Sequence, residues 1–458
     1  MFRFLPYSAF ASRIATDENI IKPGMIFIDL YSKSLASIYT AYNNGANLII
    51  TEQNIDDTLL PLVKVKNIGK SYLKLLDLIY GKPIKKASFI PIFGGNRGNI
   101  VAKILESVFK RWSLKFKQKN ELLDFSDFYI PLKYGFYVED FFYYVLNCIA
   151  HNITVIPIPY DDNIYSLEPI IGRNSECAII VESSFINDNS AFKAKNGKPL
   201  IINIDEPYAL AMINGKNENI IITYGLSKKA AVTATSIDYG EHTCFNYCLQ
   251  RTLYTRKGAT LEPFETPLSI KGLGINKIYA ALASVSCALY YDVDLDCIKE
   301  SLMDYSDRGR DFLIKQYKNF TLIDNYCTDY IDYKETLEMI QYIDYEGLYI
   351  LISDISICDE QSCKNLIVVI YELGINLNIK EIVFTSCSKS VNMGKLNNFF
   401  TQLEIISKNL NFNIKHFNQL TYALGYVINE ISKGDALLTL GGNEMDMSTT
   451  ITELILSN

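Results

Sequence analysis

The chain has 458 residues, of which 49% are hydrophobic and 21% are charged, and this composition excludes a mainly disordered protein. Its formal net charge is −7, which gives no electrostatic reason to expect a nucleic-acid partner. Polar residues and prolines interrupt the most apolar stretch, residues 141–160, and no basic segment followed by a long apolar core opens the chain. We therefore expect a cytoplasmic protein with no signal peptide and no membrane span.

The first 85 residues alternate short apolar runs with helical patterns. The strand candidates are residues 24–30, 46–52 and 62–66, and the helix candidates are residues 34–45 and 71–83. Glycine or proline follows each helical pattern, as is common where helices end. This alternation predicts a small α/β domain.

Residues 86–305 form a second region. Its strand candidates are residues 89–93, 153–158, 177–183, 199–205 and 219–225. Their β-branched runs are nearly continuous rather than alternating, which indicates strands of a parallel sheet that is covered on both faces. Two helical patterns, residues 276–291 and 294–305, close the region.

From residue 306 to the end, strand and helix patterns alternate again. The strand candidates are residues 320–326, 348–355, 381–386 and 435–440, with helical segments between them. This order predicts a doubly wound α/β domain with its own sheet. We thus predict three α/β domains, at residues 1–85, 86–305 and 306–458.

A glycine cluster follows the strand candidate at residues 89–93, and a helical pattern follows the cluster. It comprises Gly94, Gly95, Asn96, Arg97, Gly98 and Asn99. A strand, a glycine turn and a helix together direct backbone N–H groups and the positive end of the helix at one point, which is how anions are bound.

A standard phosphate loop adds a lysine for the β- and γ-phosphates and a Ser or Thr for magnesium. Here Arg97 supplies positive charge one position early, and the amide of Asn99 is a poor magnesium ligand. Three interpretations remain open on these residues alone: a catalytic phosphate site, a weak anion or nucleotide site, and a structural turn.

Nine segments occur in the order of landmarks of a known family. They are "IIKPGMIFIDL", "AYNNGANLIITE", "SFIPIFGGNRGNI", "CAIIVESSF", "IINIDEPY", "GINKIYAALASV", "DRGRDF", "LIDNYCTD" and "EIVFTSCSK". The third resembles "IGVTGTNGKTT" and the fifth resembles "VINADDPY" of the Mur ligases. Over nearly its full length the chain resembles this family, and within it the UDP-N-acetylmuramoyl-tripeptide synthetases.

The resemblance implies an α/β, three-domain Mur ligase architecture. Residues 1–85 would be an N-terminal UDP-substrate domain, residues 86–305 a central P-loop-like ATPase domain and residues 306–458 a C-terminal Rossmann-like ligase domain. It also implies ATP and Mg²⁺ as cofactors and a UDP-sugar peptide of peptidoglycan synthesis as substrate. In that reaction a carboxylate attacks the γ-phosphate, an amine takes the acyl group, and lysine and Mg²⁺ stabilise the transferring phosphoryl charge.

Compared residue by residue with the family, the phosphate loop is altered. Gly98 stands at the position of the lysine, Arg97 at that of the preceding glycine, and Asn99 and Ile100 at those of the two threonines. This comparison leaves the loop without its usual ligands for phosphate and magnesium.

The family's other chemical positions are altered too. Glu182 matches the glutamate that holds Mg²⁺, but Phe185 replaces the histidine that follows it. The stretch that carries a carbamylated lysine in the family is missing here, and residues 387–390 replace the motif that selects the amino acid. Glu182 is therefore the single metal candidate, and a carboxylate in water at a strand end is the alternative interpretation.

Three residues match the adenosine side of the family's site. Asn276 corresponds to the asparagine near the adenine, and Arg310 and Asp324 correspond to residues that approach the ribose and phosphates. The alternatives are a helix cap for Asn276 and a surface ion pair between Arg310 and Asp324.

The sequence favours a Mur-ligase-like protein whose phosphate, metal and amino-acid motifs have eroded, so that catalysis is weak or absent; no catalytic residue is assigned. Two alternatives stay open. One is an active, divergent carboxylate–amine ligase that acts on another substrate, with Arg97 in the role of the lysine. The other is a binding or scaffold protein that partners a cell-wall enzyme.

Overall fold

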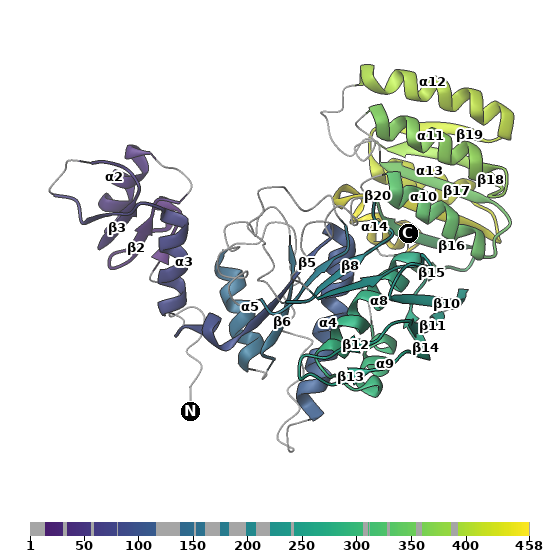
Figure 1. Cartoon of the computed structure of the whole chain (residues 1–458). Helices are drawn as coiled ribbons and strands as arrows, with labels where there is room; N and C mark the ends of the chain where they lie inside the picture. Colours follow the sequence, from purple (N-terminus) through teal and green to yellow (C-terminus); the bar gives the residue numbers. More distant parts are fainter. Residues whose placement is uncertain are drawn as a thin grey trace. The chain divides into compact units, whose positions relative to one another are not determined.

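The computed structural model describes most of the chain, which Figure 1 colours in sequence order. The described residues are 14–30, 34–55, 59–79, 81–115, 138–150, 153–160, 175–182, 198–207, 220–239, 242–305, 310, 312–327, 330–353, 360–385 and 393–457. They divide into two compact units, Met1–Tyr224 with Ser286–Asp294 and Gly225–Val285 with Leu295–Asn458. The predicted three-domain boundaries after residues 85 and 305 stay predictions.

The first unit begins with a small parallel sheet. Its strands β1 (Ile14–Ala15), β2 (Ile26–Ile28), β3 (Leu48–Thr51) and β4 (Leu62–Lys64) lie in chain order, accompanied by helices α2 (Leu35–Asn43) and α3 (Ile68–Ile79). Ser34 caps α2 by accepting a hydrogen bond from the Ser37 N–H at 3.1 Å. The strands and helices predicted for this part of the sequence are confirmed.

A second group of parallel strands completes the first unit. The strands β5 (Ser88–Phe93), β6 (Val155–Tyr160), β7 (Ala178–Ile180), β8 (Leu200–Asn203) and β9 (Ile221–Tyr224) lie in the order β9-β8-β7-β5-β6. Helices α4 (Gly95–Lys115) and α5 (Val138–Ala150) connect β5 to β6. Because all five strands are parallel, their carboxyl ends lie at one edge of the sheet, which is where α/β proteins place ligands.

The second unit begins with antiparallel strands. β10 (Val232–Tyr239) pairs with β11 (His242–Leu249), which pairs with β14 (Phe264–Lys271), and β12 (Leu253–Tyr254) and β13 (Thr260–Leu261) form a short ribbon. Helices α8 (Ile275–Tyr290) and α9 (Leu295–Met303) follow as predicted. The antiparallel strands were not predicted, because they alternate polar and apolar residues and lack the continuous apolar runs on which the strand predictions rest.

The C-terminal part of the second unit has its own sheet. Strands β15 (Leu313–Gln316), β16 (Phe320–Tyr326), β17 (Leu348–Ser353), β18 (Ile379–Thr385), β19 (Asn413–Phe417) and β20 (Asp435–Gly441) lie in the order β15-β16-β20-β17-β18-β19. All neighbours are parallel except β15, which runs antiparallel to β16. The helices are α10 (Tyr330–Met339), α11 (Glu360–Gly374), α12 (Met393–Leu410), α13 (Leu420–Glu430) and α14 (Ser448–Ser457). The predicted α/β fold class is confirmed, and the strands predicted for this region form one sheet with helices between them.

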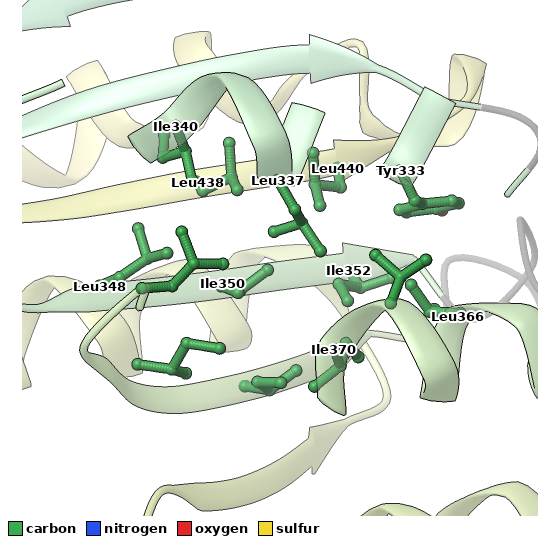
Figure 2. Packing of buried hydrophobic residues seen from close by; sticks show 14 of the residues in the cluster. Tyr333, Leu337, Ile340, Leu348, Ile350, Ile352, Leu366, Ile370, Leu438 and Leu440 are labelled. Atoms are coloured by element: carbon green, nitrogen blue, oxygen red, sulfur yellow. The ribbon is translucent and has the colours of Figure 1, made fainter. Parts of the chain in front are cut away.

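Alternate residues of this sheet serve two separate cores. On β17, Ile350 and Ile352 belong to one buried cluster with α10, α11 and α12, whereas Tyr349 and Leu351 belong to another with α13. Figure 2 shows the first cluster, in which side chains of α10 and α11 pack over those of β17 and β20. Burial on both faces explains why these strands read as continuous apolar runs in the sequence.

None of the described helices combines the length and the apolar character that crossing a membrane requires.

We expect a Leu438→Ala substitution to lower the free energy of unfolding of the chain by about 2–5 kcal/mol. Leu438 is fully buried in the cluster of Figure 2, so the truncation leaves a cavity between β20 and its neighbours. Urea denaturation followed by circular dichroism measures the change. Ile375→Ala is the matched control, because Ile375 is 70% exposed and its truncation should change stability little.

Candidate functional site

The glycine cluster lies at the junction between β5 and α4. Strand β5 ends at Phe93 and helix α4 begins at Gly95, so that Gly94 alone separates them. The Gly98 N–H donates to the Gly94 carbonyl at 2.8 Å, which is the first hydrogen bond of the helix. The expected glycine turn is therefore much shorter than predicted, and Arg97, Gly98 and Asn99 lie in the first helical turns. The N–H groups of the first turn still lack partners within the helix, as at any helix start.

Close packing between β5 and the end of β7 explains Gly94. A Cβ atom at Gly94 would lie 2.5 Å from the Val181 Cβ, which real structures do not tolerate. The Phe93 carbonyl accepts hydrogen bonds from the N–H groups of Val181 at 2.7 Å and Glu182 at 3.2 Å. A structural requirement therefore accounts for this first glycine of the cluster.

Gly98, at the lysine position of the resemblance, has space around it. A Cβ atom there would meet the Ile92 Cγ2 at 3.5 Å and the Ile92 carbonyl oxygen at 3.6 Å, which is ordinary van der Waals contact. The missing lysine therefore does not follow from steric exclusion at Cβ.

Arg97 pairs with two carboxylates at the edge of the sheet. Its Nε lies 3.4 Å from the Glu182 Oε1, and its Nη1 lies 3.9 Å from the Glu206 Oε1. Glu182 follows β7, and Glu206 follows β8. The side chains of Arg97, Glu182 and Glu206 are only 15%, 18% and 19% exposed. Glu182 is therefore an ion-paired, largely buried group, and the alternative of a carboxylate free in water at a strand end is wrong.

Sequence reasoning missed Glu206 as a site residue. The signal was present, because "IINIDEPY" places Asp205 at the end of a predicted strand and Glu206 directly after it. Asn203 shapes this loop: its side chain donates to the Val181 carbonyl at 3.3 Å and accepts from the Asp205 N–H at 3.1 Å. These bonds link the ends of β7 and β8 and hold both glutamates at the same edge.

The residues at this edge do not fit a divalent metal. Magnesium binds to carboxylates, water and substrate phosphates, but the carboxylate of Glu182 already faces a guanidinium, whose positive charge would repel a second cation. Across the part of the chain that the structure describes, no group of three or more His, Cys, Asp or Glu side chains could hold a metal ion.

Arg310 and Asp324 form a buried ion pair in the second unit. The Arg310 Nε donates to the Asp324 Oδ1 at 2.8 Å, and the two side chains are 8% and 0% exposed. The Arg310 Nη1 donates to the carbonyls of Gly441 at 2.9 Å and Gly442 at 2.6 Å, and its Nη2 donates to the Asn325 carbonyl at 3.1 Å. The alternative of a surface ion pair is wrong, because this guanidinium ties together the carboxyl ends of β16 and β20.

The carboxylate of Asp324 is equally well satisfied. Its Oδ1 also accepts from the Thr439 hydroxyl at 2.5 Å, and its Oδ2 accepts from the hydroxyls of Ser448 at 2.8 Å and Thr449 at 3.2 Å. Buried charges with this many partners hold a structure together, and removing one partner leaves the other uncompensated.

Asn276 is the second residue of α8, which begins at Ile275. The helix-cap alternative is therefore wrong, since a cap lies before the first helical residue. The Asn276 Oδ1 is buried and receives no hydrogen bond from the described residues. A buried acceptor without a donor is unusual in a folded protein, and a ligand that carries an N–H group could supply one.

Glu106 is a further titratable group on α4. Burial raises its pKa to about 7, while Lys110 and Lys103 lower it. It lies nine residues beyond Arg97, which corresponds to roughly 14 Å along the helix. We therefore assign Glu106 to the packing of α4 and not to the site at its N-terminus.

Together, these features define the class of the protein: a multidomain α/β chain in which a strand, a glycine and a helix form a phosphate-loop-like junction. No protein-family model matches the sequence. Two curated relatives are UDP-N-acetylmuramoyl-L-alanyl-D-glutamate–2,6-diaminopimelate ligases. That of Caldanaerobacter subterraneus subsp. tengcongensis is 21% identical over 353 residues, covering 72% of this chain and 69% of the relative. That of Clostridium botulinum is 22% identical over 361 residues, with the same coverage.

The solved structures agree on the fold. The MurF ligase from Thermotoga maritima in complex with ADP matches over 98% of both chains, with a TM-score of 0.64 and 12% sequence identity. A MurF structure from Acinetobacter baumannii matches with a TM-score of 0.65 at 14% identity, covering 97% of this chain and 93% of that one. The chain is therefore similar in sequence to these Mur ligases and shares the fold of the solved MurF structures.

Two glycines of the same cluster should respond oppositely to substitution. We expect Gly94→Ala to lower the free energy of unfolding by about 1–3 kcal/mol, because its Cβ collides with Val181. Gly98→Ala should leave stability unchanged or raise it by up to about 1 kcal/mol, because its Cβ fits and alanine favours the helix. Denaturant unfolding of both variants measures the difference, and equal losses would contradict the packing described for the two positions.

We expect Asp324→Asn to destabilise the chain by about 3–5 kcal/mol, because it removes the buried counter-charge of the Arg310 guanidinium and leaves it Asp446, whose carboxylate is 3.8 Å away and 56% exposed. Thermal unfolding of the purified variant measures the loss. Glu453→Gln is the control: it breaks the Lys315–Glu453 pair, which is also 2.8 Å long but about half exposed, and should cost less than about 1 kcal/mol. A small effect of Asp324→Asn would show that Arg310 can turn to solvent.

Proposed function

We propose that the chain is a Mur-ligase-family protein that keeps a nucleotide site but performs the ligase reaction weakly or not at all. The observation that carries this proposal is the arrangement of Arg97, Glu182 and Glu206 at the carboxyl edge of the sheet. The cationic residue of the loop and the carboxylate that matches a magnesium ligand are engaged with each other, which disfavours their use on a substrate.

The charge balance supports the same conclusion. Phosphoryl transfer depends on cations that neutralise the charge developing on the transferred group. Here one guanidinium lies between two carboxylates, so the three side chains carry a net negative charge. This net charge would repel a polyphosphate, whereas the backbone N–H groups at the start of α4 would attract it.

Nucleotide binding has separate support in the second unit. The buried Oδ1 of Asn276 needs a donor, and the amino group of an adenine is a donor of this kind. Arg310 and Asp324, by contrast, support the fold through internal bonds. Of the three residues proposed for the adenosine side, Asn276 is thus the one that we retain as a direct contact.

The proposed ligands follow from the relatives. Their names specify a UDP-N-acetylmuramoyl peptide, and one solved neighbour holds ADP. We propose that this chain binds an adenine nucleotide and a UDP-activated muramoyl peptide or a related carboxylate in the cytoplasm, in the setting of peptidoglycan synthesis. The alternative of an active ligase on another substrate rests on Arg97, the cationic residue of the glycine cluster.

We expect the chain to bind ATP weakly, with little dependence on Mg²⁺, and to release no ADP above the background rate. Weak binding is expected because the buried Oδ1 of Asn276 can accept a hydrogen bond from adenine. Little dependence on Mg²⁺ is expected because Glu182, which matches a magnesium ligand, pairs with Arg97. Isothermal titration calorimetry with ATP, with and without Mg²⁺, measures the first expectation. A coupled ADP assay with UDP-muramoyl peptides and amino acids measures the second. Tight, Mg²⁺-dependent binding or acceptor-dependent ADP release would favour the divergent ligase.

Restoring the lysine should not restore catalysis. We expect Gly98→Lys to fold, since a Cβ is accommodated at Gly98, and to show no ATP turnover, because Arg97 still pairs with Glu182. The control is Gly98→Ala, which changes the helix in the same way without adding charge. Turnover by the lysine variant alone would show that Gly98 is the sole defect.

A further inference from the structure

The site at the carboxyl edge of the first unit holds a cation that belongs to the chain itself. Arg97 comes from the first turn of α4, whereas Glu182 and Glu206 come from the segments that follow two neighbouring parallel strands. The three side chains are each less than one-fifth exposed. Two carboxylates in such a place need positive charge nearby, because burial disfavours an unpaired ion.

Hydrogen bonds that do not involve Arg97 hold the segments that carry the two carboxylates. The Glu182 N–H donates to the Phe93 carbonyl at 3.2 Å, and Asn203 connects the end of β7 to the loop that carries Glu206. Asn203 is itself 5% exposed, so these bonds lie in the core. These bonds would therefore still hold the backbone segments that carry Glu182 and Glu206 if the guanidinium were removed.

The contacts of Arg97 are those of a shared counter-ion. Distances of 3.4 Å and 3.9 Å are longer than the 2.7–2.9 Å or so of a direct charge-assisted bond, and one guanidinium faces both partners. Because Arg97 is covalently part of the chain, its local concentration near the carboxylates exceeds that of a free ion at millimolar levels. Free metal would have to displace it.

We propose that the Arg97 guanidinium is the resident cation of the Glu182–Glu206 pair, that it occupies the place a divalent metal would take, and that the wild-type site consequently excludes divalent metal. Two carboxylates with water are a sufficient ligand set for weak Mg²⁺ or Mn²⁺ binding. Removing Arg97 should therefore turn an internal ion pair into a metal site. This inference deepens the proposed function, on which it rests for the assignment of the site.

The test measures Mn²⁺ binding to the full chain in the absence of nucleotide, by the electron paramagnetic resonance signal of free Mn²⁺. We expect no binding by the wild type at about 1 mM and binding by Arg97→Ala with a dissociation constant on the order of 0.1–1 mM, at least tenfold tighter than the wild type. Mn²⁺ should also raise the melting temperature of Arg97→Ala but not that of the wild type.

Matched double variants locate the metal. Adding Glu182→Gln or Glu206→Gln to Arg97→Ala should abolish the binding, and Arg97→Lys, which keeps a tethered cation, should behave as the wild type. If Arg97→Ala does not fold, Arg97→Met is used in its place, because methionine keeps most of the aliphatic part of the side chain. Mn²⁺ binding by the wild type that Glu182→Gln removes, or no binding by a folded Arg97→Ala or Arg97→Met, would overturn the proposal.

Because nucleotide is absent from this test, its outcome is separate from that of the proposed function. ATP turnover by a wild type that excludes Mn²⁺ would refute the weak or inactive ligase and leave the resident cation intact. Mn²⁺ binding by a wild type that shows no ATP turnover would refute the resident cation and leave the weak or inactive ligase intact.

Discussion

The contact between the ends of β5 and β7 sets the geometry of the first unit's site. The Phe93 carbonyl accepts hydrogen bonds from the N–H groups of the two residues that follow β7. Gly94 lies so close to Val181 that a side chain at position 94 would collide with it. Because of this close contact, α4 begins immediately after β5. The side chain of Arg97, three residues after Gly94, therefore reaches Glu182 at the edge of the sheet. A longer turn would separate Arg97 from Glu182 and leave room for a loop around a phosphate. The ion pairs are thus a consequence of where the helix begins.

The central strands could be predicted from the sequence because burial on both faces demands continuous apolar residues. β17 and β20 meet this condition, and their alternate side chains enter two different cores. The strands that were missed face other constraints. β15 and β19 are edge strands with several part-exposed positions, and β10, β11 and β14 alternate in character, so neither group contains the long apolar run that identifies a central strand.

The sequence predicted which residues lie at the site better than it predicted the contacts between them. The glycine cluster, Glu182 and the acidic pair after β8 are all visible in the sequence as residues at or just beyond the ends of predicted strands. Their partners are not, because the Arg97 contacts join segments far apart in the chain and depend on the register of three parallel strands. The same limitation applies to Asp324, whose hydroxyl partners come from β20 and α14. The sequence shows which of these positions carry a charge. The folded structure shows which partners compensate each charge.

The two arginines that the sequence singled out differ in what they can still do. Arg310 is buried and has four hydrogen bonds of 2.6–3.1 Å, so moving it toward a ligand would break bonds that water cannot replace in the core. Arg97 is more exposed, and its distances to the carboxylates of Glu182 and Glu206 are longer than those of direct hydrogen bonds. Moving the Arg97 side chain would cost less free energy than moving that of Arg310, because solvent reaches the carboxylate partners of Arg97. Of the two, Arg97 is therefore the residue through which a ligand could act on the fold, and Arg310 is the residue on which the fold of the second unit relies.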